Sequence, residues 1–401
     1  MAVLTQNEKF SSEKFSIFSY GFRPFFLAAG IYAILPLIPW VLYFLEIFST
    51  NIPLQTWHAH EMLFGFVAAA INGFLLTAIP NWTNTPPLTG TKLKHFFYLW
   101  LSGRIAFWIY LFIDHPLAGY FLFLDLLLPV LQGVRITRIF ITTGSKRNFI
   151  FIAIIAALAV ANLLVILDLN DITSGTAQIG AIFAPNVMMI FIAVIGGRVT
   201  FNFTRSYLKQ QNSTVQVRTF PLIEKCAIGS LVLNAAIDFI NPHSIISYSI
   251  ALIACALHAL RFSLWVSLKT FGNPLIWVLH LGYFWLIIAL FLKGAESWLE
   301  LPYNLYLHAL TLGAVGINIL GIMSRAALGH TGRQLQASPS ITVSYLLIFA
   351  SVIMRVITPF YPDFFVWGMV LSAAFWISAF SLYLWVYAPI LTSPRIDGKS
   401  G

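Results

Sequence analysis

The sequence predicts an all-α, polytopic membrane helix bundle with about twelve transmembrane helices and both termini in the cytoplasm. Hydrophobic residues make up 59% of the 401 residues, charged residues make up only 9%, and the mean hydropathy is +0.83. Apolar stretches of bilayer length follow one another with short loops between them, and Lys and Arg collect in alternate loops. A water-soluble domain cannot present so much apolar surface to solvent, so the composition excludes a soluble enzyme.

The apolar stretches define the expected spans in order along the chain. Each is roughly 20 residues long, which suffices to cross a hydrocarbon core of about 30 Å. The expected spans are 22–45, 58–80, 95–113, 117–139, 148–168, 177–198, 222–241, 247–268, 273–293, 304–326, 341–360 and 364–390. The longest loop is expected at about 199–221, so residues 1–401 form one transmembrane domain with short cytoplasmic tails at 1–21 and 391–401.

Basic residues gather on one side of these spans. Of the 23 Lys and Arg residues, all but three fall in loops or span ends on the side of the two termini; Lys293 and Arg355 fall on the opposite side, and Arg104 lies inside the third span. Cytoplasmic loops carry such an excess, which places both termini in the cytoplasm. The net charge of +9 is therefore a topology signal, and no nucleic-acid partner is expected, because such a binder clusters its charge on one face or tail.

Histidines inside the spans are the strongest candidates for a functional role. Neutral imidazole is a frequent metal ligand, and an unpaired polar ring in hydrocarbon is costly. The alternative interpretation is that these rings only hydrogen-bond neighbouring helices together. The candidate metal ligands are His58, His60, His258, His280, His308 and His330.

The segment Trp57-His58-Ala59-His60-Glu61-Met62 opens the second span. At about 100° per residue, His58 shares a face with Glu61 and Met62, whereas His60 points to the opposite side. The two rings therefore cannot bind one metal from a regular helix. Small residues further along the face of His58 permit either close helix packing or the approach of a flat macrocycle.

Several motifs together resemble the NnrS family. They are Tyr20-Gly21-Phe22-Arg23-Pro24-Phe25-Phe26, Trp57-His58-Ala59-His60-Glu61-Met62, Gly73-Phe74-Leu75-Leu76-Thr77-Ala78, Asn81-Trp82-Thr83 and Gly329-His330-Thr331-Gly332-Arg333. The resemblance implies a twelve-span protein of the bacterial inner membrane that binds haem, of b type, and copper. It also implies a role in nitric oxide metabolism, denitrification or resistance to nitrosative stress, with nitric oxide as ligand and an arrangement akin to haem-copper oxidases.

The implied metals give the histidines and arginines specific hypotheses. His58 or His60 with His308 is expected to form a centre near the outer surface, and His258 and His280 are the candidates for a second one. Guanidinium groups match the carboxylates of haem propionates, so Arg23, Arg104, Arg261 and Arg325 are candidate cofactor-binding residues. Asp125, Asp238 and Glu61 are equally available as their partners inside the protein.

Three functions stay open from the sequence. The first is a haem- and copper-containing protein that binds or reduces nitric oxide, for which a quinol or a redox partner protein would supply electrons. The second is a membrane transporter of a small solute or metal, although the repeated broken helices of transporters are not evident. The third is a non-catalytic sensor that holds haem or copper. No residue is assigned a catalytic role, and the lipid bilayer is the one partner common to all three.

Overall fold

The computed structural model describes residues 17–113, 115–302 and 304–399. These residues form helices and connecting loops without any strand, which confirms the predicted all-α bundle. Most of the predicted N-terminal tail, residues 1–21, lies outside the described part of the chain.

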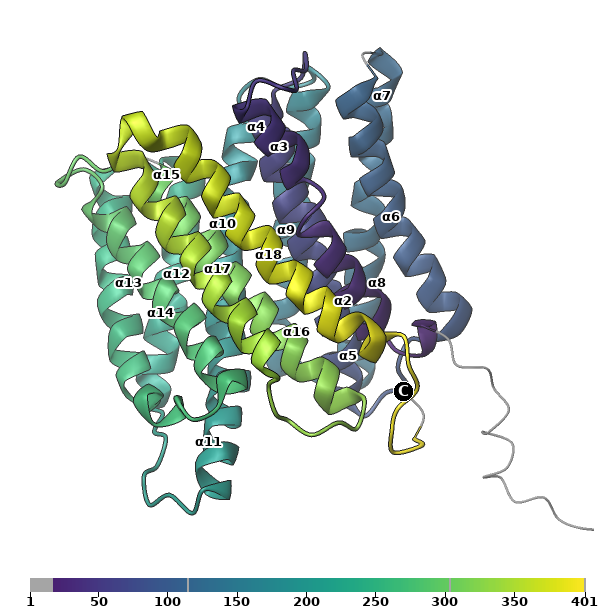
Figure 1. The fold of residues 1–401 in the computed structure, drawn as a ribbon, viewed down its shortest axis with the longest axis vertical. Coiled ribbons are helices and arrows are strands. Elements are labelled where there is room, and N and C mark those ends of the chain that lie inside the picture. The colour runs from purple at the N-terminus through teal and green to yellow at the C-terminus, as the bar shows by residue number, and fades with distance from the viewer. Residues whose placement is uncertain (1–16, 114, 303, 400–401) are drawn as a thin grey trace, which may run out of the picture.

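The helices run along one another in a single bundle (Figure 1). Several predicted spans consist of two or three consecutive helical segments. The main helices are α2 (Phe22–Tyr32), α3 (Leu37–Phe44), α4 (Leu54–His60), α5 (Ala68–Thr83), α6 (Gly90–Phe112), α7 (Pro116–Phe121), α8 (Leu127–Thr142), α9 (Ile150–Leu169), α10 (Thr176–Ile195), α11 (Phe201–Gln210), α12 (Pro221–Ile240), α13 (Ile245–Ser263), α14 (Pro274–Ala295), α15 (Asn304–His308), α16 (Ile317–His330), α17 (Pro339–Ile357) and α18 (Phe365–Leu391).

Ten helices in the described part of the chain are long and apolar enough to cross a membrane. They correspond to predicted spans at the first, second, fourth to sixth and eighth to twelfth positions. The two other predicted spans, 95–113 and 222–241, are also helices in the structure, α6 and α12, of 23 and 20 residues. Both lie within the bundle (Figure 1), so the arrangement agrees with a polytopic membrane protein.

The predicted loop at 199–221 is wrong in its first half. The sixth span continues through a short π-helix, η5 (Gly196–Thr200), into α11, so that one helical stretch covers Thr176–Gln210. The α11 segment projects beyond the other helices at one end of the bundle (Figure 1). Its sequence is polar, but its first turn continues the helix of the span directly, and nothing there breaks it.

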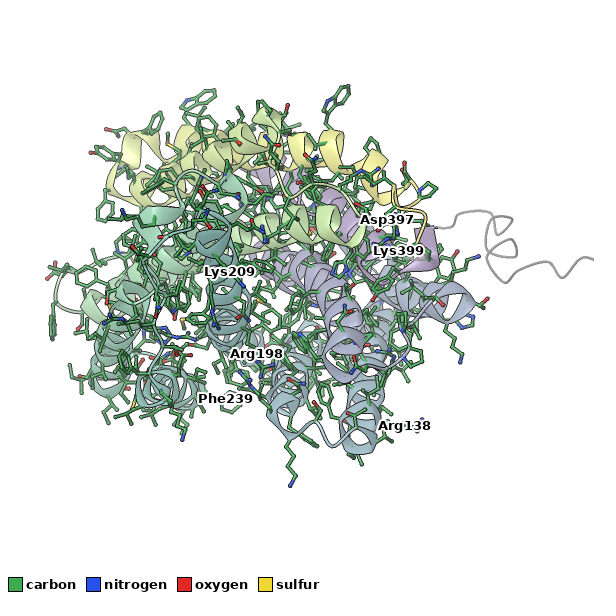
Figure 2. The ribbon with its side chains drawn as sticks, turned by 90° about the horizontal axis from the view of Figure 1, so that it is seen from below. Arg138, Arg198, Lys209, Phe239, Asp397 and Lys399 are labelled. Atoms are coloured by element: carbon green, nitrogen blue, oxygen red, sulfur yellow. The ribbon has the colours of Figure 1, made fainter. Side chains whose placement is uncertain are left out.

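Both described ends of the chain lie at the end of the bundle where α11 projects (Figure 1). Figure 2 shows the molecule from that end and labels four basic residues there, Arg138, Arg198, Lys209 and Lys399. By the positive-inside rule, this end is the cytoplasmic one. The opposite end carries α4 and α15, the two segments that end in His60 and His308 (Figure 1).

The second and tenth spans share an irregularity next to their histidines. Directly after His60, the helix changes to a π-helix, η2 (Glu61–Val67), and directly after His308 it changes to a second π-helix, η7 (Ala309–Gly316). The π-helix is rare and occurs frequently at functional sites. The two segments therefore point to the outer half of the bundle as the place to look for a site.

The first and last helices are joined by direct contacts. The buried guanidinium of Arg23 donates hydrogen bonds to the carbonyl oxygens of Leu391 (2.9 Å) and Ser393 (2.8 Å) at the end of α18. The Nε1 atom of Trp376, in the middle of α18, donates to the carbonyl of Ala33 at 2.8 Å. These bonds satisfy carbonyls that a helix end leaves without an intrahelical partner.

Candidate metal centre

A cavity of about 580 Å³ lies between the second and tenth spans. The lining residues come from α3, α4, η2, α10, α15, η7, α17 and α18, and they include both His58 and His308. These two histidines are 250 positions apart in the sequence, so only the fold brings them to one cavity. Of the two histidines expected to form a centre with His308, His58 lines the cavity and His60 does not.

The ring of His58 is held in place by stacking, and one of its nitrogens makes no hydrogen bond to a described residue. Trp40 of α3 stacks on it, with ring centroids 4.4 Å apart and an interplanar angle of 8°. The Nδ1 atom of His58 is buried and has no hydrogen-bond partner among the described residues. A buried polar atom without a partner is costly, and a bound group is one way in which such an atom is satisfied.

Other side chains of the cavity add donor types that the sequence alone did not single out. Met62, one turn beyond His58, and Met369 of α18 both line it, and their thioether sulfurs are soft ligands of the kind that copper(I) accepts. Arg355 of α17 also lines the cavity and forms no ion pair with a described carboxylate. Lys and Arg counting predicts only that Arg355 lies on the outer side, and the structure adds that it lines this cavity.

His60 points away from the cavity, as its helical spacing from His58 predicts. Its Nδ1 lies 2.9 Å from Oε1 of Glu61, and its Nε2 lies 2.8 Å from Oδ1 of Asn162. Both partners are oxygen acceptors, so with both bonds made the ring carries a proton on each nitrogen. Its face stacks on Phe107 at 3.5 Å. In this state His60 has no lone pair to offer a metal.

A buried cluster of charges surrounds His60. Arg104 of α6 forms ion pairs with Glu61 and with Asp125, and Asp125 also accepts a hydrogen bond from Asn162 at 2.9 Å. Two cations, Arg104 and the doubly protonated His60, thus face two carboxylates. The alternative that Arg104 pairs with Glu61 and Asp125 inside the protein is the one seen here. Glu61 lies beside His60 and not on the face of His58, because the regular helix ends at His60.

His258 and His280 are also engaged by the protein. His258 Nδ1 lies 2.6 Å from the Tyr283 hydroxyl and its Nε2 donates to the carbonyl of Ala227 at 3.0 Å. His280 has the hydroxyl of Thr204 2.8 Å from Nε2 and that of Ser267 2.8 Å from Nδ1. Neither histidine lines the cavity of His58 and His308. Both form bonds that tie helices together.

The remaining candidates lie elsewhere in the bundle. His330, at the cytoplasmic end of α16, stacks on Tyr20 with ring centroids 6.0 Å apart. Arg261 pairs with Glu224 at 2.5 Å, and the guanidinium carbon of Arg325 lies 3.9 Å from the centre of the Phe203 ring. Arg23 binds the carbonyls at the end of α18, as described above. None of these residues lines the cavity.

No group of three or more His, Cys, Asp and Glu side chains with metal-binding geometry occurs in the described part of the chain. A metal in the cavity would therefore take most of its ligands from another source or from sulfur. Trp40, Met369, Arg355 and the two π-helices are the features that sequence reasoning missed. The π-helix after a histidine has no sequence signal that we can identify.

The architecture is that of a polytopic helical membrane protein, with its candidate site at the outer half of the bundle. The comparison with known families makes this class specific. The model of the NnrS protein family matches residues 16–395. The chain therefore belongs to the NnrS family. No curated protein matches it.

Proposed function

We propose that this chain is a haem- and copper-containing protein of the bacterial inner membrane that binds nitric oxide in the cavity of His58 and His308. The observation that carries the proposal is the convergence of these two histidines on one cavity, together with the buried Nδ1 of His58, which has no hydrogen-bond partner among the described residues. Family membership supports the choice of metals.

The residues of the cavity fit a haem. Haem needs only one or two protein ligands, because the porphyrin supplies the others, and the described residues offer no three-residue cluster of His, Cys, Asp and Glu. The volume of about 580 Å³ is within the range of roughly 300–1,000 Å³ that is typical of small-molecule pockets. Arg355 offers a guanidinium for a propionate carboxylate.

The same cavity offers donors for copper. Met62 and Met369 supply thioether sulfur, and His58 and His308 supply imidazole, a combination of soft and intermediate ligands that suits copper(I). We assign His58 and His308 as metal ligands, with the methionines as additional donors to copper.

The chain's own residues account for ligand binding as follows. When bound, a haem would supply an iron centre for nitric oxide. Trp40 fixes the ring of His58 through stacking, so that its free Nδ1 keeps one direction. Leu63, Phe66 and Trp376 form apolar walls, which admit a small uncharged gas and exclude hydrated ions.

The first test is an absorption spectrum with metal analysis of the purified protein, oxidised in air and then reduced with dithionite. We expect a Soret band, reduced alpha and beta bands, and copper. His58→Ala and His308→Ala should each lose haem or copper, whereas the matched control His258→Gln should keep both, because both ring nitrogens of His258 are bonded to Tyr283 and Ala227.

Two outcomes would contradict the proposal. If both alanine variants kept the wild-type content of haem and copper, the ligand assignment would be wrong. If the wild-type protein bound neither metal when both were supplied during expression, the transporter hypothesis would lead, and uptake into liposomes would test it. Titration with nitric oxide then separates binding from turnover.

A further inference from the structure

A second, apolar groove lies on the other side of the first span. It has a volume of about 750 Å³ and runs between α2 and α6. Its lining extends from Ile17 and Phe18 at the cytoplasmic end to Phe112 and Ile113 at the outer end. The exposed side chains along it, such as Ile31 and Ile105, are 42% and 51% accessible, so the groove opens to the lipid.

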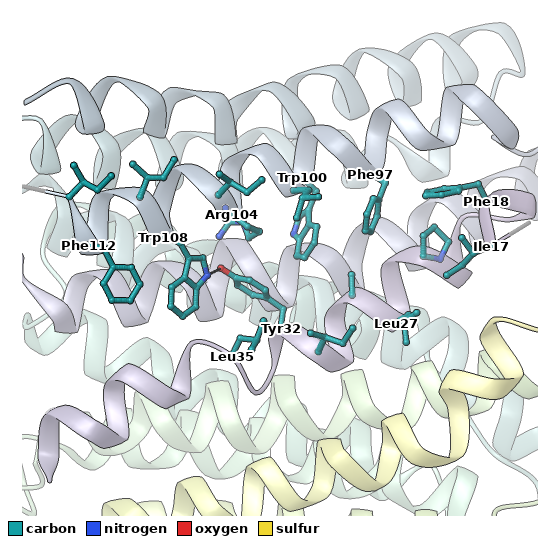
Figure 3. Close-up of a pocket in the computed structure, with 17 residues that line it drawn as sticks. Ile17, Phe18, Leu27, Tyr32, Leu35, Phe97, Trp100, Arg104, Trp108 and Phe112 are labelled. Atoms are coloured by element: carbon teal, nitrogen blue, oxygen red, sulfur yellow. Dashed lines mark hydrogen bonds between the residues drawn. The ribbon is translucent and has the colours of Figure 1, made fainter. Parts of the chain in front are cut away.

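A polar site interrupts this apolar groove near half the height of the bundle. Figure 3 shows Arg104, Trp108 and Tyr32 next to one another in the middle of the groove. Trp108 Nε1 donates a hydrogen bond to the hydroxyl of Tyr32 at 2.9 Å, and this hydroxyl donates to Glu61. Arg104 lies near the middle of α6, and Tyr32 near the middle of the first span, Phe22–Phe44.

Arg104 keeps one donor without a partner. Its Nη1 and Nη2 atoms pair with Glu61 and Asp125, but its buried Nε atom has no hydrogen-bond partner among the described residues. The residue is 1% exposed and lines the groove. A ligand in the groove whose acceptor reached this buried atom would satisfy the donor.

We propose that this groove binds an isoprenoid quinone, with a ring carbonyl accepting a hydrogen bond from Arg104 and the isoprenoid tail lying along the apolar wall. An uncharged carbonyl is a suitable acceptor, since both charges beside Arg104 are already paired. The volume of the groove is within the range of roughly 300–1,000 Å³ of ligand pockets. The claim that this quinone gives electrons to the metal cavity rests on the proposed function. The claim that the groove binds a quinone does not.

The depth of the polar site favours a quinone over a phospholipid. A phospholipid keeps its headgroup at the membrane surface and can place only its acyl chains at mid-membrane, where they offer no acceptor. A quinone ring can reach that depth, because its polar groups are uncharged. The apolar residues on both sides of Arg104 then suit the tail.

The groove is connected to the metal cavity through the second span. The Tyr32 hydroxyl donates to Glu61, and Glu61 contacts His60, which is two residues beyond His58. The groove is lined by residues 17–35 and 97–113, and the cavity is lined by other residues of the first span and by His58 and its neighbours in the second span. A quinone in the groove would thus be linked to the candidate metal centre through these contacts without entering the cavity.

The test is photo-crosslinking of the full purified chain in nanodiscs with an azido-ubiquinone, followed by peptide mapping. We expect labelled peptides from α2 and α6 and competition by unlabelled decylubiquinone. Ile105→Trp, which fills the groove from α6, should reduce labelling about tenfold, and Ile31→Trp should do the same from α2. Ile253 of α13 is 57% exposed and lies outside the groove, so the control Ile253→Trp should be labelled like the wild type.

A subtler variant tests the ring contact. Arg104→Lys keeps the charge for Glu61 and Asp125 but loses the Nε donor, so the concentration for half-maximal labelling should rise about tenfold. Unchanged labelling in both tryptophan variants, or competition by phospholipid but not by decylubiquinone, would overturn the inference. Photo-labelling of the groove can be measured without haem. A wild-type protein that held no haem or copper but was still labelled in the groove would refute the proposed function and leave this inference standing.

Discussion

Replacing Arg104 with methionine should be one of the most destabilising single changes in this chain. The side chain is 1% exposed and pairs with Glu61 and Asp125, which are 0% and 4% exposed. Arg104→Met keeps much of the volume of the side chain but removes a cation. Two buried carboxylates then face only the doubly protonated His60.

The expected magnitude follows from the number of charges left without a partner. Removing one member of a buried ion pair costs roughly 3–5 kcal/mol, because the other charge stays buried and uncompensated. Arg104 serves both carboxylates within one network, so its two contributions do not simply add, and we expect a loss of about 3–5 kcal/mol in the free energy of unfolding. This corresponds to a change of at least about 100-fold in the unfolding equilibrium.

The assay is unfolding by SDS in mixed micelles, followed by tryptophan fluorescence. Arg138→Met is the matched control, because Arg138 is exposed at the cytoplasmic end. The triple variant Arg104→Met, Glu61→Gln, Asp125→Asn should recover most of the lost stability, since its cluster no longer holds unpaired carboxylates. If Arg104→Met were as stable as the control, or if the triple variant recovered nothing, the charge argument would be refuted.

Two further predictions concern other charged contacts. Lys293→Met should destabilise the protein by about 3–5 kcal/mol in the same SDS assay, because it strands the buried Asp238, and Asp238→Asn in the same chain should restore stability. At the C-terminus, the hydrogen bond and charge of Arg395 hold the pKa of the exposed Asp397 carboxyl below its usual range near 3.9. The hydrogen bond from the Ile396 amide to the Thr331 carbonyl should therefore persist at about pH 5 and be lost only as the pH falls through that lowered pKa. Amide hydrogen exchange at Ile396 measures the loss of this bond. Exchange that accelerates already at about pH 5 would contradict the prediction.

The spans could be predicted largely from hydropathy because each helix must satisfy its backbone inside the lipid. The two helices that fall short of an apolar span show the limit of this signal. α6 carries Lys92 and Lys94 at its cytoplasmic start and Arg104 in its middle, and the charge of Arg104 is neutralised by residues from two other helices. A sequence window cannot include those partners.

The site was predictable only in part, for a related physical reason. Helical spacing separates His58 from His60, and that separation holds in the structure. Which histidines hydrogen-bond other helices depends on Asn162, Tyr283 and Thr204, which come from helices distant in the sequence. Periodicity along one helix carries no information about those contacts.

The bonds from Arg23 to the end of α18 have a consequence for how the protein is made. Arg23 is near the start of the first helix to leave the ribosome, and its acceptors, Leu391 and Ser393, are among the last residues translated. Until Leu391 and Ser393 have been translated, Arg23 cannot form these hydrogen bonds. The packing of the first span is therefore completed only when translation ends, and a chain cut short before Leu391 would retain an unfinished first helix that cellular proteases can recognise.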